Sequence, residues 1–112
     1  MKARKQAPRW QRYELKAEVL QGLAHPIRLA VADLLSGGEV CVCDIATAVG
    51  AERSNVSRHL AVMMRSGIVR TRKEGLKVYY RLRTPCILEF MSCATRTLET
   101  DLEERTRALA EA

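Results

Sequence analysis

The chain has 112 residues, enough for one small domain, and a formal net charge of +6. It holds no apolar run of about 18 residues, and its basic N-terminus has no apolar stretch behind it. Neither a membrane span nor a secretory signal is therefore expected, and the predicted location is cytoplasmic. Residues 1–83 hold sixteen Lys and Arg against seven Asp and Glu, whereas residues 84–112 hold three against six. This basic body favours a polyanionic partner such as nucleic acid.

The first third of the chain is predicted to be helical after a polar start. Residues 1–9 are basic and are expected to form a flexible arm, followed by a single domain over residues 10–112. Apolar side chains at imperfect helical spacing predict a helix over residues 10–24. Pro26 suits the first turn of a second helix, and Gly37 marks the end of that helix.

Two shorter helices, separated by a tight turn, are predicted next. The first covers about residues 41–49 and is closed by Gly50. The second is expected to be capped by the Ser54 hydroxyl and to run to about Ser66. Its predicted inward face holds Val56, Leu60 and either Met63 or Met64, and its outward face holds Asn55, Ser57, Arg58 and His59.

The pattern then changes from helical to alternating. Residues 68–73 and 76–82 are rich in β-branched and aromatic side chains and flank the turn Glu74-Gly75, which predicts a β-hairpin. A last long helix is predicted over about residues 85–110. The expected fold class is therefore mainly α with a β-hairpin.

This order of elements is typical of winged helix-turn-helix domains that bind double-stranded DNA. The polar helix face can enter the major groove, and the hairpin can contact phosphates or the minor groove as a wing. Each polar residue taken alone is more often solvated surface, but their combination on a basic body favours DNA. The predicted DNA contacts are Arg53, Ser54, Asn55, Ser57, Arg58 and His59 from the helix and Arg70, Arg72, Lys73 and Lys77 from the wing.

Four stretches of the chain form a pattern in register. They are Leu23-Ala24-His25-Pro26-Ile27-Arg28-Leu29, Glu39-Val40-Cys41-Val42-Cys43-Asp44-Ile45, Ser54-Asn55-Val56-Ser57-Arg58-His59-Leu60, and Gly67-Ile68-Val69 followed by Gly75-Leu76-Lys77-Val78-Tyr79-Tyr80. Together they resemble the ArsR/SmtB family of metal- and metalloid-responsive repressors. The resemblance implies a homodimer that pairs through its first and last helices and binds an imperfect palindromic operator. The acidic balance and apolar stripe of about residues 85–110 fit a dimer interface independently.

The chain has four cysteines, Cys41, Cys43, Cys86 and Cys93. Structural disulfides are rare in the cytosol, so metal binding or redox chemistry is favoured, although each cysteine could also be a small buried apolar residue. Cys41 and Cys43 fall at the start of the third helix, and a helix N-terminus favours thiolates. Residues two apart do not face each other in a helix, so a shared ion requires Cys41 to lie in extended backbone.

The resemblance also suggests how a third ligand is supplied. Trivalent arsenic or antimony takes three thiolates in a pyramid, and several relatives place a third cysteine where this chain has Ala46. Cys86 or Cys93 must then complete the site, and at about 10.5 Å apart along a helix they cannot bind one ion together. We choose Cys93, within or between subunits, because Cys86 follows Pro85 at the helix entrance.

The predicted inducer is As(III) or Sb(III), with no permanently bound cofactor. Relatives that sense zinc, cobalt or nickel use His, Asp and Glu on the last helix, and this last helix has no histidine. His25 is expected at a helix junction and His59 on the DNA. Cadmium or lead on the same thiolates stays open as an alternative.

Two rival interpretations use the same cysteines differently. The first keeps the repressor and makes it a thiol redox or persulfide sensor. The second is a small thiol redox enzyme. Against the enzyme, the chain has a Cys-x-Cys rather than a Cys-x-x-Cys, and it has no strand–helix crossover or phosphate loop. We therefore predict no catalytic residues.

Overall fold

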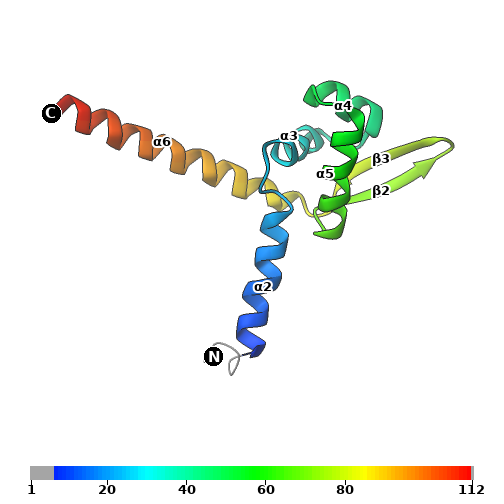
Figure 1. The fold of residues 1–112 in the computed structure, drawn as a ribbon, viewed down its shortest axis with the longest axis horizontal. Coiled ribbons are helices and arrows are strands. Elements are labelled where there is room, and N and C mark those ends of the chain that lie inside the picture. Colours follow the sequence, from blue (N-terminus) through cyan, green and yellow to red (C-terminus); the bar gives the residue numbers. More distant parts are fainter. Residues whose placement is uncertain (1–6, 112) are drawn as a thin grey trace.

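The computed structural model describes residues 7–111 as five α-helices, two 3-10 turns and three strands (Figure 1). The predicted mainly α fold with a β-hairpin is confirmed. The helices are α2 (Ala7–Gln21), α3 (Pro26–Leu34), α4 (Val42–Val49), α5 (Arg53–Arg65) and α6 (Leu88–Glu111). The strands are β1 (Val40–Cys41), β2 (Val69–Glu74) and β3 (Lys77–Leu82), and the 3-10 turns are η1 (Leu35–Gly37) and η2 (Pro85–Ile87).

Several predicted boundaries differ from the structure. The first helix ends at Gln21 rather than at residue 24, and the second ends at Leu34, before the 3-10 turn η1. Residues 1–6 of the expected arm lie outside the described residues, whereas residues 7–9 form the first turn of α2 rather than part of an arm. Ser54 is not the cap of α5, because the helix already begins at Arg53 and its N-cap is Glu52, whose side chain makes no capping hydrogen bond. The last helix opens with the tighter turn η2 before it continues as α6.

The sheet has one strand more than the predicted hairpin. β1 pairs antiparallel with β3, with Val40 opposite Tyr80 and Cys41 opposite Tyr79, and the strand order is β1-β3-β2. Two residues are too few to show an alternating pattern, so the sequence did not reveal β1. Gly38, at φ 122°, lets the chain leave η1 and enter this strand. As a result, Cys41 belongs to the same sheet as the wing.

One hydrophobic core joins α3, α4, α5 and the base of the hairpin. It includes the predicted inward face of α5, and it decides between the two methionines, because Met63 is fully buried while Met64 is 39% exposed. The largest fully buried side chains of this core are Ile45, Leu60, Met63, Val31, Val56 and Val69.

Helix α2 and most of α6 lie outside this core, which α6 contacts only through Leu88 and Met91 near its start. Figure 1 shows both projecting from the body in different directions. No residue of α6 is buried, and residues 9–21 of α2 are all exposed. Among the described helices, none is both long and apolar enough to span a membrane. The exposed large apolar side chains of α2 and α6 are Trp10, Tyr13, Leu15, Val19, Leu20, Phe90, Leu98, Leu102 and Leu109.

Candidate nucleic-acid interface and cysteine site

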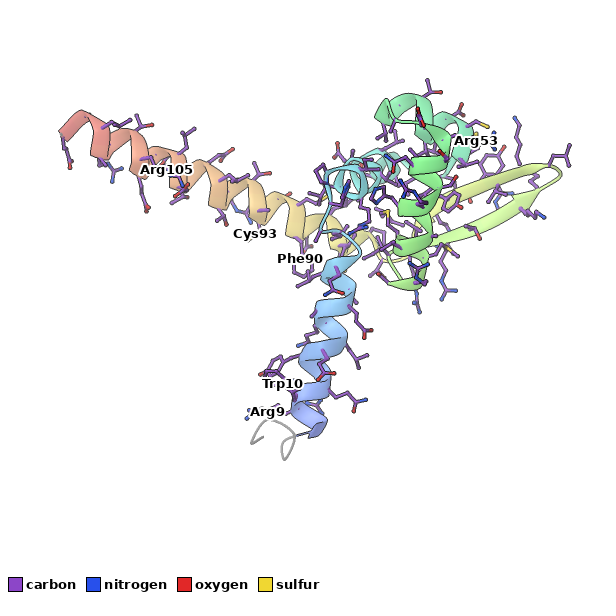
Figure 2. The ribbon with its side chains drawn as sticks, in the orientation of Figure 1. Arg9, Trp10, Arg53, Phe90, Cys93 and Arg105 are labelled. Carbon is purple, nitrogen blue, oxygen red and sulfur yellow. The ribbon has the colours of Figure 1, made fainter. Side chains whose placement is uncertain are left out.

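The amino-terminal part of α5 presents most of the predicted DNA contacts to solvent. Arg53, Ser54, Ser57 and Arg58 are exposed, and Asn55 is half-buried. Figure 2 shows Arg53 at the end of α5 that lies beside α4. The Asn55 amide oxygen accepts a hydrogen bond of 2.8 Å from the Arg58 guanidinium. This bond holds two groups suited to base edges or phosphates in one orientation before any DNA is present.

His59 lies one turn after Asn55 and is likewise half-buried, so its role as a DNA contact stays a prediction. Its ring is half-buried against His25, with ring centroids 4.0 Å apart, and its Nδ1 accepts from the Arg28 guanidinium at 3.2 Å. Desolvation of the ring, followed by the charges of His25, Arg28 and Arg58, lowers the pKa of His59 below its ordinary value. His59 therefore lies between α5 and the start of α3.

The wing carries its cations on both faces. In the antiparallel register of β2 and β3, Arg70 lies opposite Arg81 and Arg72 opposite Tyr79 on one face, while Lys73 lies on the other. The expectation that Arg70 and Arg72 share a face is confirmed. Arg70, Lys73 and Lys77 are exposed, so they are available for phosphate contacts.

Arg72 is bound within the protein, unlike its neighbours. Its guanidinium makes a two-pronged ion pair with Glu39, with a shortest N–O distance of 2.8 Å, and bonds Glu74 at 2.8 Å. It also lies 4.8 Å from the centre of the Tyr79 ring. These hydrogen bonds raise the pKa of Arg72 and lower the pKa of Glu39. Arg72 thus ties the segment before β1 to the wing, a role that its sequence position did not indicate.

The first two cysteines lie where the chain passes from β1 into α4. Cys41 is the N-cap residue of α4, with φ −78° and ψ 155°, so the extended backbone predicted for it is confirmed. Its thiol is half-buried and donates to the Asp44 carboxylate at 3.2 Å, while Cys43 is exposed in the first turn of the helix. No side chain caps this helix end.

A cavity of about 220 Å³ opens beside this cysteine pair. Its walls come from four elements: the end of β1, the start of α4, the first residue of α5 and the tip of the wing. It brings the two thiols next to two of the predicted DNA-contacting cations, Arg53 and Lys77, from distant parts of the chain. The lining side chains are Cys41, Val42, Cys43, Asp44, Arg53, Leu76, Lys77 and Val78.

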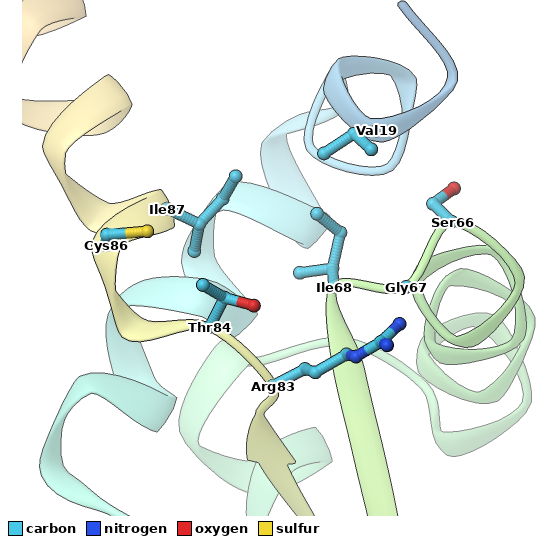
Figure 3. A pocket seen from close by; sticks show the side chains of 8 residues that line it. All are labelled: Val19, Ser66, Gly67, Ile68, Arg83, Thr84, Cys86 and Ile87. Carbon is cyan, nitrogen blue, oxygen red and sulfur yellow. The ribbon is translucent and has the colours of Figure 1, made fainter. Parts of the chain in front are cut away.

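The other two cysteines lie elsewhere. Cys86 lines a cavity of about 320 Å³ between α2, the end of α5 and η2, where its neighbours include Val19, Ile68 and Arg83 (Figure 3). Cys93 lies exposed on the projecting part of α6 (Figure 2). Within residues 7–111 of one chain, no three His, Cys, Asp or Glu side chains are placed to hold a metal ion. One chain therefore does not assemble the predicted set of Cys41, Cys43 and Cys93.

Sequence reasoning missed two residues that organise the site, Arg28 and Glu39. Arg28 bonds the carbonyl oxygens of Gln21 and Ala24 at the end of α2, as well as His59 on α5. Arg28 lies in the first of the four stretches quoted above, four residues after Ala24, a spacing that places a side chain back over the preceding turn. Nothing in the sequence pairs Glu39 with Arg72, because the two lie 33 residues apart.

Comparison with known proteins is consistent with this geometry. Residues 25–71 match the family model of the arsR family of bacterial regulatory proteins. An HTH-type transcriptional regulator of Mycobacterium tuberculosis, named as uncharacterised, is 37% identical over an alignment of 102 residues that covers 87% of this chain and 86% of the relative. The arsenical resistance operon repressor of Escherichia coli K12 is 44% identical over 69 residues, 61% of this chain and 59% of the relative.

Solved structures share the fold. The crystal structure of M. tuberculosis Rv0081 superposes with a TM-score of 0.72 at 36% identity, covering 84% of this chain and 95% of the other. A homodimeric winged helix-turn-helix DNA-binding domain from Mycobacterium bovis has a TM-score of 0.70 at 32% identity, covering 82% of this chain and 85% of the other. The named relatives are regulators and a repressor rather than enzymes. This chain is a winged helix-turn-helix protein and belongs to the ArsR family of transcriptional regulators.

Proposed function

We propose that this regulator is a homodimeric repressor that leaves its operator when the thiolates of Cys41 and Cys43 bind trivalent arsenic or antimony. Soft thiolates are the donors that such ions prefer. The E. coli relative is named as an arsenical resistance repressor, which agrees with this inducer class. The proposal covers residues 10–112 as one functional domain.

One observation carries the proposal: the cysteine pair and two DNA-facing cations line the same cavity. Arg53 begins the helix that enters the major groove, and Lys77 begins the second strand of the wing. An ion held by both sulfurs occupies the space between these two cations. Its binding therefore acts directly on the surface that meets phosphate.

The backbone gives a second route from the thiols to the wing. Cys41 pairs with Tyr79 in the sheet, whereas Cys43 belongs to α4. Drawing the two sulfurs onto one ion changes the angle between β1 and α4. The wing moves with β1, because its strand β3 pairs with β1. An allosteric coupling of about 1–3 kcal/mol corresponds to DNA binding that is roughly 5- to 150-fold weaker.

The proposed dimer uses the apolar faces of α2 and α6. A projecting helix with exposed Phe90, Leu98 and Leu102 is costly in water, and a second copy of the chain covers it. The M. bovis neighbour is described as a homodimer. Cys93, the third thiolate that we predicted, lies on this same helix, so its sulfur reaches the Cys41–Cys43 pair only from the partner chain.

Fluorescence anisotropy of a labelled operator duplex tests the proposal. The duplex is one that the protein itself selects from a random-sequence library. We expect arsenite to release the parent protein and to leave the Cys41→Ser/Cys43→Ser variant bound. Cys86→Ser is the matched control, because Cys86 lines a different cavity and should not change release.

The same titration, repeated with a third variant and with other inducers, distinguishes the alternatives. Loss of release in Cys93→Ser supports a third thiolate from the partner. Release of the double serine variant at the parent's arsenite concentration contradicts the proposal. Release of the parent by oxidant or persulfide alone supports the redox sensor, and release by cadmium or lead alone moves the inducer to those ions.

A further inference from the structure

Three side chains meet where α2, α3 and α5 come together, away from the cysteines. His25 is the N-cap of α3, and its Nδ1 accepts the backbone N–H of Ile27 at 3.1 Å. Arg28, one turn further on, reaches back to the end of α2 and across to α5. The His59 ring completes the group from α5, 4.0 Å from the His25 ring at a tilt of 32°. We call His25, Arg28 and His59 the α3 junction.

Arg28 connects all three helices of the α3 junction. One terminal nitrogen donates to the carbonyl oxygens of Gln21 and Ala24 at 3.0 and 3.4 Å, and the other lies 3.2 Å from His59 Nδ1. Its Nε is buried and has no partner among the described residues. A guanidinium has donors and no acceptor, so His59 Nδ1 must be the acceptor.

In the structure each imidazole accepts a hydrogen bond through Nδ1, which only a ring without a proton on that nitrogen can do. His25 Nδ1 accepts from a backbone N–H, and His59 Nδ1 accepts from a guanidinium, so in each ring the proton lies on Nε2. Protonating His25 removes the acceptor that caps α3. Protonating His59 removes the acceptor for Arg28 and places two cations 3.2 Å apart.

The charges around the α3 junction add to this effect. Those that act on His59 come from His25 at the start of α3, Arg28 within α3 and Arg58 on α5 itself, and all are cationic or become so in acid. From α2, Arg28 meets backbone carbonyl oxygens of Gln21 and Ala24. In the described residues, no carboxylate contributes to the His59 environment, and its pKa is lowered.

We propose that His25, Arg28 and His59 are positioning residues that hold the recognition helix α5 against α2 and α3 only while both imidazoles are neutral, so that mild acid weakens operator binding. This inference rests on the DNA-binding function proposed above, but not on the thiolate inducer. It concerns protons, and the cysteine pair is not involved.

The sign of the effect separates this role from a direct DNA contact. A histidine that touches phosphate gains charge in acid, so its protonation tightens binding and steepens the salt dependence. A histidine in the α3 junction weakens binding when it gains the same proton. A pKa difference of one unit between bound and free protein changes the binding constant about tenfold. Because the pKa of His59 is already lowered in the free protein, we expect affinity to fall severalfold between roughly pH 7.5 and pH 5.5 and to approach the tenfold limit only in stronger acid.

Operator affinity across this pH range, measured with the library-selected duplex, is the test. The key variant is His25→Asn/His59→Gln, because Asn is a favourable N-cap and the Gln oxygen can accept from Arg28 without titrating. The readout is the ratio of affinities at the two pH values, which cancels any change at neutral pH. We expect a ratio of several for the parent and close to unity for the double variant, with circular dichroism confirming the fold at both pH values.

NMR supplies a readout that needs no DNA. The chain has two histidines, so the single variants assign both rings. We expect the Ile27 amide resonance to report the loss of its hydrogen bond to His25 in acid. We expect Arg28→Gln, which removes one of the cations that act on His59, to raise the pKa at which His59 titrates. An equal acid loss in the double variant, tighter binding of the parent in acid, or an Ile27 amide that ignores pH would each overturn the inference. Arsenite release at neutral pH is measured separately, so failure of the inducer proposal remains distinguishable.

Discussion

The body of the protein, from α3 to β3, buries its large apolar side chains, whereas the two helices that flank it expose most of theirs. The body closes a core in which Val31, Ile45 and Leu60 are fully buried. α2 and α6 carry large apolar side chains, such as Tyr13 at 54% and Leu98 at 69% exposure, and no residue of α6 is buried. Most helical stability in proteins comes from packing an apolar face, so α6 depends on a surface that one chain does not supply. The difference indicates that the body closes most of its core within one chain, whereas the exposed apolar faces of the flanking helices are suited to assembly.

The largest expected effect tests the α6 side of this comparison. Leu98 and Leu102 are four residues apart, so they share one helix face. Replacing both by Glu removes two apolar side chains from the proposed dimer interface, each contributing about 1.5–3 kcal/mol. We expect the dimer to dissociate at micromolar concentration in analytical ultracentrifugation while the body stays folded. Thr100→Glu, on the opposite side of the same helix, is the control and should leave the dimer intact. A dimer that survives the double variant would place the interface elsewhere.

The next effect tests the body with two adjacent residues. Met63 is fully buried and Met64 is 39% exposed, although they follow each other on α5. Met63→Ala leaves a cavity and should lower the free energy of unfolding by about 2–5 kcal/mol. Met64→Ala should cost less than about 1 kcal/mol, as most exposed substitutions do. Urea denaturation of the two variants measures the difference, and equal losses would show that the core extends to the exposed face of α5.

The same pair of residues shows how far sequence reasoning reaches. Helical spacing placed Val56 and Leu60 inward, but it could not choose between Met63 and Met64, because a stripe about 100° wide admits both. His59 is adjacent to Leu60, at the edge of that stripe. Its position between α5 and α3 depends on His25 and Arg28, which lie more than 30 residues away. Hydrophobic periodicity predicts which face of a helix is buried, but it does not identify the residues of other elements that pack against the edge of that face.

The wing and the cysteine site were also predicted only in part, because sequence patterns describe local structure and not contacts between distant residues. Alternation predicted the hairpin, and the local argument for extended backbone at Cys41 was correct. The strand β1 has two residues and was missed, and with it the pairing of Cys41 with Tyr79. Arg72 looked like a free wing cation until Glu39 was found beside it. Local chemistry was predictable in each case, and contacts across the chain were not.

A smaller effect is expected at the boundary between body and α2. A Cβ built on Gly22 lies 2.6 Å from Ser66 Cβ and 2.8 Å from Ile68 Cγ1, so α2 leaves the body through a contact that admits only glycine. Gly22→Ala should lower the free energy of unfolding by about 1–3 kcal/mol through overpacking. Gly37→Ala is the matched control, since a Cβ there meets nothing within 4 Å. Thermal unfolding followed by circular dichroism measures both. Equal stability of the two variants would mean that α2 shifts freely and does not pack on the body.

The smallest effect concerns the wing, the part of the body that is most exposed. Arg72 lowers the pKa of Glu39, so this carboxylate contributes stability above its ordinary value near 4.5, and that stability is lost as pH falls through the lowered pKa. In Glu39→Gln the melting temperature should fall less steeply than in the parent as pH is lowered from about 6 to about 3. Glu74→Gln removes the other carboxylate bonded to Arg72 but keeps the link between β1 and the wing, so its melting temperature should fall as steeply as the parent's. Hydrogen exchange of the β3 amides at neutral pH then shows whether Glu39 joins the wing to the body. Unchanged β3 exchange in Glu39→Gln would show that strand pairing alone holds the wing in place.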